Sequence, residues 1–180
     1  MGTRSSRKAA SRGWAPKPPS IGPVDAGLRL LGRRAHSSTE MRRKLARRGY
    51  SESDVQAAVE RLVELGYLDD RSFAEGHVRR RSSVLGPRAL SAELAARGVD
   101  RAVADLAIGD FDEGSQLESA TRLAERLCAR KTVAGYRELL DSVGPKLLRR
   151  GFSPGIVRVA CRAIWNGTAG SPEEASAPAV

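Results

Sequence analysis

The sequence has little of several features that define whole classes of proteins. It contains no run of about 18 apolar residues, so no transmembrane helix is predicted, and its first residues lack the apolar stretch of a secretory signal. Only 4% of the residues are aromatic, which argues against recognition of single-stranded nucleic acid by base stacking. The two cysteines, Cys128 and Cys161, do not have a metal-ligand spacing. We therefore expect two reduced, buried thiols in a cytoplasmic protein, with a disulfide between them as the alternative.

Catalytic and metal-binding motifs are missing as well. The sequence has no glycine-rich phosphate loop, nucleophile elbow or zinc signature. His36 and His77 stand singly and far apart, so we expect them at surface or boundary positions. The acidic residues between 110 and 113 lack the ligand alternation of a calcium loop and are typical of a solvated linker. The sequence predicts neither an enzyme nor a bound metal or cofactor.

What the sequence does have is positive charge. The formal net charge is +10, with 31 Arg and Lys residues against 21 Asp and Glu residues. Residues 1–24 hold five of these cations and no anion, but most of the excess lies beyond them. By count, residues 114–165 carry ten cations against four acids, whereas residues 69–113 carry seven against nine. Such a balance predicts an anionic partner: a nucleic acid, an acidic protein surface or a nucleoprotein.

Three segments repeat one pattern: KLARRGY at 44–50, ELAARGV at 93–99 and LLRRGF at 147–152. Each has a leucine four residues before a glycine, an arginine directly before it and an apolar residue directly after it. The pattern is typical of a helix C-terminus, because glycine adopts the left-handed conformation there and the next apolar residue folds back on the last turn. The arginine complements the negative end of the helix dipole. A period of about 50 residues indicates stacked helical units.

The fold predicted from these signals is all-α: three tandem three-helix modules, resembling helix-turn-helix repeats, in a curved array. The modules are expected at 23–68, 69–113 and 114–166, between a disordered basic arm at 1–22 and a disordered tail at 167–180. Capping and apolar patterns place the helices at 25–34, 37–48, 51–65, 70–83, 87–97, 100–108, 116–131, 136–150 and 154–165. Gly144-Pro145 is expected to kink or break the eighth of these helices.

Clusters of arginine are the candidate binding residues. Arg122, Arg126 and Arg130 recur at i, i+4 and i+8, which places them on one helix face opposite Leu123 and Leu127. The full set of candidates is Arg43, Arg47, Arg79, Arg80, Arg81, Arg122, Arg126, Arg130, Arg158 and Arg162. Any one cluster alone is also explained as a solvated face. Several clusters on one array, without matching acids in the third module, favour binding.

The stretch from residue 30 to 99 resembles the RecX family, bacterial regulators of the RecA recombinase. Its most specific fragment is GYLDDRSFA, which includes Gly66, Asp69, Asp70 and Phe73. Adjacent carboxylates do not face each other on a helix, so we interpret Asp69 and Asp70 as structural: a cap and an acid that complements the helix dipole. The resemblance extends over about residues 25–165.

The resemblance implies a protein that lodges in the groove of the RecA–DNA filament and inhibits the ATPase, recombinase and co-protease activities of RecA. The partners so implied are the RecA filament and single- or double-stranded DNA, and we expect a monomer without membrane association. An alternative is direct binding to duplex DNA, which basic helix corners also permit. A third reading is a helical scaffold whose charge serves solubility alone.

Overall fold

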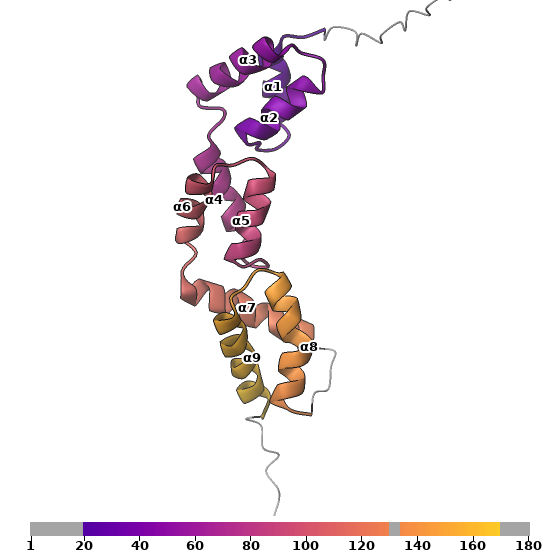
Figure 1. The fold of residues 1–180 in the computed structure, drawn as a ribbon, viewed down its shortest axis with the longest axis vertical. Helices are drawn as coiled ribbons and strands as arrows, with labels where there is room; N and C mark the ends of the chain where they lie inside the picture. Colours follow the sequence, from indigo (N-terminus) through magenta and orange to yellow (C-terminus); the bar gives the residue numbers. More distant parts are fainter. Residues whose placement is uncertain (1–19, 130–133, 170–180) are drawn as a thin grey trace, which may run out of the picture.

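A computed structural model describes residues 20–129 and 134–169, and it is all-α within these ranges (Figure 1). The described helices are α1 (Pro23–Leu31), α2 (Ser38–Ala46), α3 (Glu52–Glu64), α4 (Asp70–Arg81), α5 (Pro87–Ala96), α6 (Arg101–Gly109), α7 (Glu113–Cys128), α8 (Tyr136–Arg149) and α9 (Pro154–Ala169). The expected all-α repeat is therefore confirmed. Most of the arm and tail expected at 1–22 and 167–180 lies outside the described residues.

The helices bury three separate hydrophobic cores, one for each consecutive set of three helices. Met41, Leu45 and Leu62 are the largest fully buried side chains of the core that α1–α3 share. Leu90 and Leu94 occupy the same place among α4–α6, and Leu139, Leu147 and Phe152 among α7–α9. Burying one such side chain contributes about 1.5–3 kcal/mol, so each core holds its three helices together. We call these sets the first, second and third bundle.

The helix ends follow the glycine pattern. Gly49, Gly98 and Gly151 have φ angles of 88°, 74° and 87°, in the left-handed region that only glycine adopts without penalty. We call the turn at each of these glycines a corner. After two of the corners the amide N–H of the next residue bonds back to the helix: Val99 donates to the Leu94 carbonyl at 3.1 Å, and Phe152 to the Leu147 carbonyl at 3.3 Å. Both side chains are buried, as the pattern predicts for the apolar residue after the glycine.

The bundles stack by docking the corners at Gly98 and Gly151 onto the start of the middle helix in the preceding bundle. At the first junction, Ser37 and Thr39 at the start of α2 donate from their hydroxyls to the carbonyls of Arg97 and Gly98, at 2.6 Å and 2.9 Å. These carbonyls belong to the end of α5, where a helix has no partners of its own for them. The middle helix of one bundle therefore ends on the beginning of the middle helix of the bundle before it.

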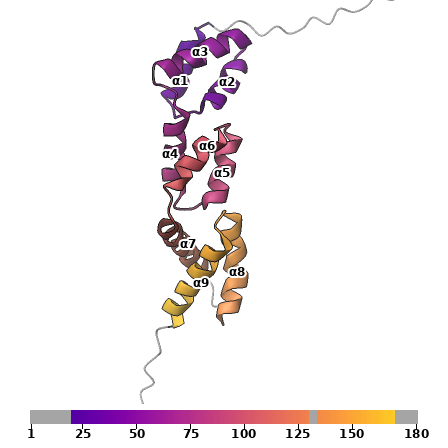
Figure 2. The same ribbon diagram turned by 60° about the vertical axis from the view of Figure 1, so that its left-hand side comes forward.

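The second junction repeats the arrangement with main-chain atoms. The Gly86 and Arg88 amides at the start of α5 donate to the carbonyls of Arg150 and Gly151, at 2.8 Å and 3.3 Å. A methyl group on Gly86 would lie 2.5 Å from the Phe152 nitrogen, so only glycine permits this approach. As a result α2, α5 and α8 form a head-to-tail column along the long axis, which both views show on one side of the molecule (Figures 1 and 2).

Two local expectations need correction. Pro145 does not break α8, which runs without interruption from Tyr136 to Arg149. Both Pro145 and Asp141 are exposed, so the carbonyl of Asp141, which loses its helical partner to the proline, can bond to water instead. The last helix is also longer than expected, since α9 continues to Ala169 rather than ending at residue 165.

Candidate partner-binding surface

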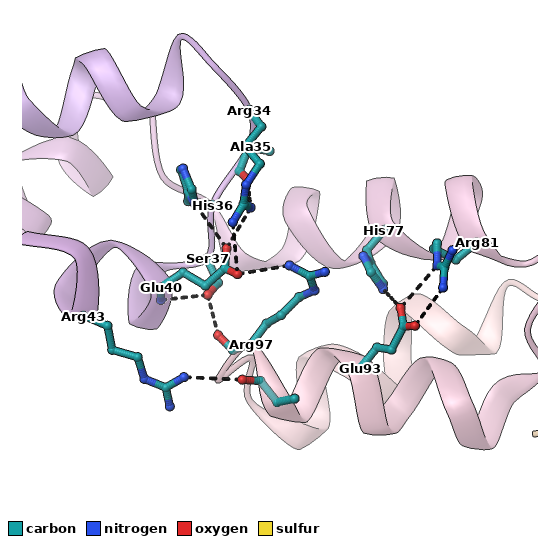
Figure 3. Close-up of polar contacts among 11 residues, drawn as sticks. Arg34, Ala35, His36, Ser37, Glu40, Arg43, His77, Arg81, Glu93 and Arg97 are labelled. Carbon is teal, nitrogen blue, oxygen red and sulfur yellow. Dashed lines mark hydrogen bonds and ion pairs between the residues drawn. The ribbon is translucent and has the colours of Figure 1, made fainter.

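Charged side chains gather where the first bundle meets the second. Glu40 on α2 accepts hydrogen bonds from three residues: Arg34 at 3.0 Å, His36 at 3.2 Å and Arg97 at 3.0 Å (Figure 3). Ser37 is the N-cap of α2, and its hydroxyl accepts from the Glu40 amide at 3.1 Å. The Glu40 side chain points away from this cap. It turns toward Arg97, which comes from the corner of the next bundle, and so ties two bundles together.

A second carboxylate lies nearby on α5. Glu93 accepts from Nε2 of His77 at 2.8 Å and from Nη2 and Nε of Arg81 at 2.9 Å and 3.3 Å (Figure 3). The hydrogen bond from Arg81 holds the pKa of the Glu93 carboxyl below its ordinary value, and the bond from His77 adds to this effect. For Glu40, burial alone would raise the pKa, but the hydrogen bonds from Arg34 and His36 outweigh it and the pKa is lowered. Both carboxylates are therefore ionised at neutral pH.

The two histidines sit behind these carboxylates. His36 and His77 are only 4% and 5% exposed, so they lie at a boundary between bundles but not on the surface. Burial lowers the pKa of both imidazoles, against the opposing hydrogen bonds with Glu40 and Glu93. Both rings are thus neutral at pH 7. In the described residues no three His, Cys, Asp or Glu side chains gather in a way that could hold a metal ion.

The adjacent acids of GYLDD act on two different helices. Asp69 is the N-cap of α4 and accepts from the Arg71 amide at 2.9 Å. Asp70 instead accepts from the Ser38 amide at 2.7 Å, at the start of α2 in the first bundle. Of the other motif residues, Gly66 has a φ of 74° at the end of α3, and Phe73 is buried in the second core. The motif therefore lies at the link between the first two bundles.

A cleft of about 670 Å³ opens beside these networks. Its walls carry four arginines, Arg34, Arg80, Arg81 and Arg97, together with Phe73, His77 and Glu93. We call it the junction cleft. Arg34 and Arg97, which the sequence did not single out as binding residues, enter it from the loop before α2 and from the corner after α5. Arg97 could have been noticed as the arginine before a corner glycine, but its role there was predicted to be with the helix dipole alone.

The run Arg79-Arg80-Arg81 is divided between two hollows. Arg80 and Arg81 line the junction cleft, whereas Arg79 lines a second hollow of about 440 Å³. Arg122 of the third bundle enters this second hollow, together with Ser82, Ser115 and the acids Glu75, Asp110 and Glu118. The structure thus brings Arg79 and Arg122 together across a bundle boundary, among enough acids to offset their charge.

The remaining candidates lie on separate exposed faces. Arg122 and Arg126 are exposed on α7, with Leu123 buried behind them, and Arg122 pairs with Glu118 at 3.3 Å; Arg130 lies outside the described residues. On α9, Arg158 is exposed and the Arg162 guanidinium lies 3.9 Å from the centre of the Tyr136 ring, a cation–π contact. Arg43 donates to the Ala96 carbonyl at 3.4 Å across the first junction, and Arg47 is exposed.

The two cysteines lie apart from these charged sites. Cys128 and Cys161 form no disulfide, and burial raises the pKa of the Cys161 thiol to about 11, so this thiol stays protonated and unreactive. Within the described ranges no helix has the length and apolar character that crossing a bilayer requires.

Comparison with known proteins gives one consistent family. Residues 25–62 match the family model described as RecX, first three-helix domain, and residues 69–108 match RecX, second three-helix domain. A regulatory protein RecX of Stenotrophomonas maltophilia strain K279a is 40% identical over 143 residues, which is 78% of this chain and 85% of the relative. A regulatory protein RecX of Mycobacterium sp. strain JLS is 38% identical over 132 residues, 70% of this chain and 72% of the relative.

Solved structures agree in fold. The crystal structure of RecX from Lactobacillus salivarius superposes with a TM-score of 0.72 at 25% identity, covering 79% of this chain and 94% of that one. A second crystal structure of a regulatory protein RecX gives a TM-score of 0.70 at 23% identity and bears on the fold alone.

Proposed function

This chain belongs to the RecX family of regulatory proteins, and on that premise we propose that it binds RecA–DNA filaments and inhibits the recombinase, ATPase and co-protease activities of RecA. The observation that carries the proposal is the match to regulatory RecX proteins over about four fifths of the chain, through both three-helix domains. The proposal makes the protein a binder and not an enzyme, in the cytoplasm where RecA and its DNA are found.

The architecture supports binding along an extended partner. The three bundles stack into an elongated array whose junctions are fixed by main-chain and buried polar hydrogen bonds. Charge along this array is uneven, because the third repeat carries ten cations against four acids while the middle repeat carries more acids than cations. In an array of this kind the basic end can bind DNA or an acidic protein surface, while the middle binds a protein surface of mixed charge.

Direct reading of duplex DNA is the rival proposal, and the helices that follow the corners weigh on it. In a helix-turn-helix reader the helix after the corner enters the major groove. In the first bundle this helix is α3, whose exposed face holds Glu52, Asp54, Glu60 and Glu64 beside a single Arg61. Such a face repels phosphate. In the third bundle the equivalent helix, α9, exposes Arg158 and Arg162, so it suits a direct reader better than α3 does.

The decisive experiment measures DNA-dependent ATP hydrolysis by RecA with and without this protein. Inhibition at amounts well below one protein per RecA subunit, unchanged when bare DNA is added in excess, is expected for a protein that acts on the filament. A competitor for DNA would need enough protein to coat the strand, and its inhibition would disappear as more DNA is added. That second result would favour the rival proposal.

The exposed arginines of the third bundle are proposed contacts with the anionic partner. Replacing Arg122, Arg126 and Arg130 together with Ala is expected to weaken filament binding at low salt and to matter less at high salt, because long-range attraction is screened. The control is Arg101→Ala on α6, which removes an exposed cation whose ion pair is with Asp105, one turn away on the same helix. Equal affinity of the triple variant and this control at low salt would show that the stripe is only a solvated face.

A further inference from the structure

We propose that the junction cleft is a binding site for an acidic segment of a protein partner, whose carboxylates pair with the guanidinium groups on its walls. If the proposed function is correct, this segment belongs to the protein part of the filament and not to its DNA, and for that identity alone the inference rests on the proposed function.

The cleft has more positive than negative charge. Four arginines line it, and the two carboxylates within their reach are Glu93 on the wall and Glu40 behind it. The histidines are neutral at pH 7, so they do not alter this balance. Two positive charges are left over. A cleft with low-dielectric walls and an excess of one charge attracts ligands of the other sign.

Arg80 is the arginine most available to a ligand. It is exposed, and it forms no ion pair with any residue in the part of the chain that the structure describes. Its neighbours are partly used: Arg81 holds Glu93 through two nitrogens, and Arg34 holds Glu40 through two. Arg97 uses one nitrogen on Glu40. A guanidinium has five N–H donors, so all of Arg80 and part of Arg97 remain for an incoming carboxylate.

Gly76 leaves the space that the Arg80 guanidinium occupies. Glycine is a poor helix former, yet Gly76 is in the middle of α4. A methyl group at this position would lie 3.1 Å from Nη1 of Arg80, and its three nearest atoms outside the local backbone all belong to the Arg80 guanidinium. The missing side chain therefore leaves room for the guanidinium to lie along the helix, beside the mouth of the cleft. A larger residue at 76 would displace the guanidinium without changing the charge of the protein.

The size and walls of the cleft favour a carboxylate over a nucleic acid. About 670 Å³ accommodates a few side chains, whereas a DNA duplex is far too wide to enter. A single strand would need exposed rings for its bases, but the only aromatic ring on the wall besides His77 is Phe73, which is buried and stacked against His77. Guanidinium groups already grip carboxylates here in two-point contacts, with Glu93 as the example.

The chain offers a site-specific probe of this cleft, because its only two histidines are both at the first junction. The experiment titrates the full-length protein with a hexaglutamate peptide and follows the imidazole signals by NMR at low salt. His77, which lines the cleft, should show a saturable shift, and hexaglutamine should produce none. The same titration with a six-nucleotide thymidine strand tests phosphate as the ligand.

Variants distinguish the effect of moving the Arg80 guanidinium from the effect of removing its charge. Arg80→Gln should weaken hexaglutamate binding about tenfold, since a hydrogen-bonded ion pair is lost. Gly76→Leu should weaken it by a comparable factor although every charge is retained, with far-ultraviolet circular dichroism confirming that α4 still forms. Arg101→Gln, which removes a side chain that is 92% exposed on α6, should leave the affinity unchanged.

Three results would overturn the inference. One is the absence of any shift of the His77 signals. Another is an equal loss of affinity in Arg80→Gln and Arg101→Gln, which would mean attraction by net charge alone. The third is a thymidine strand that shifts His77 as strongly as hexaglutamate, which would assign the cleft to nucleic acid. None of these depends on RecA, so they are distinct from a failure of the ATP hydrolysis assay.

Discussion

The corner glycines allow the stacking of bundles to be tested by one methyl group. Gly151 and Gly66 both have left-handed backbones, with φ of 87° and 74°, but only Gly151 is docked on another bundle. A Cβ at Gly151 would lie 2.3 Å from the Ala89 nitrogen, whereas a Cβ at Gly66 meets nothing within 4 Å. Alanine at the two positions therefore separates the cost of the backbone conformation from the cost of disturbing the junction.

The expected magnitudes follow from these contacts. An alanine in the left-handed conformation costs about 1–2 kcal/mol, and this is the whole effect expected for Gly66→Ala. In Gly151→Ala the start of α5 must also move away from α8, which breaks the two hydrogen bonds from the Gly86 and Arg88 amides. Each contributes about 0.5–1.5 kcal/mol. We expect Gly151→Ala to lower the free energy of unfolding by about 2–5 kcal/mol in total.

Urea unfolding with two probes distinguishes the outcomes. The chain has two tryptophans, so in a Trp14→Phe background the fluorescence of Trp165 reports on the third bundle, while far-ultraviolet circular dichroism reports on all helices. The two curves should coincide in the parent and in Gly66→Ala. In Gly151→Ala they should separate, because repeat units uncouple when their interface weakens. If Gly151→Ala is no less stable than Gly66→Ala and its curves still coincide, the second junction does not couple the bundles.

Two further predictions concern the first junction. Burial lowers the pKa of His36 and His77, so the unfolded chain takes up protons near pH 6.5 more readily than the folded one, and the free energy of unfolding should fall as the pH drops below about 6.5. It should fall again below about 4.5 as Glu40 and Glu93, whose pKa values are also lowered, become protonated. Urea unfolding across this pH range should show a flatter upper step when both histidines are replaced by Gln, and an unchanged upper step would refute the assignment. Asp70→Ala should speed hydrogen exchange of the Ser38 amide, its partner at 2.7 Å, whereas Asp69→Ala should not; equal exchange in both variants would argue against the cap between bundles.

Local patterns in the sequence were sufficient for the helices but not for their stacking. A corner depends on a glycine and the few residues around it, so Gly49, Gly98 and Gly151 could be placed from sequence. The contact between Gly98 and Thr39 joins residues about sixty positions apart, so no local sequence pattern in either segment predicts it. Of the kink or break predicted at Gly144-Pro145, the break does not occur, because a proline is tolerated where the freed carbonyl reaches water. That exposure depends on the packing of the other helices.

The candidate site was predictable in part. Arg80 and Arg81 were singled out by their charge, and they do line the junction cleft. Arg34 was missed because it looks like an ordinary surface arginine until the second bundle is placed beside it. The histidines were expected at the surface or at a boundary, and both lie buried at the boundary between the first two bundles. The pair of His36 and Glu40 could have been predicted, because the two residues are four positions apart in the sequence. The pair of His77 and Glu93 could not, because these residues are sixteen positions apart.

The second junction has a consequence for how such a chain can change in length. Its contacts at Gly86 and Gly151 join main-chain atoms, so these hydrogen bonds require two glycines and a helix start, whatever the side chains on the outer faces. A duplicated stretch of about 50 residues that carried one helix-start glycine, such as Gly86, and one corner glycine, such as Gly98, would bring both halves of the next joint with it. Lengthening the array by one unit is then a single genetic event. The side chains on the outer faces can afterwards change independently, so that each unit can bind a different partner surface.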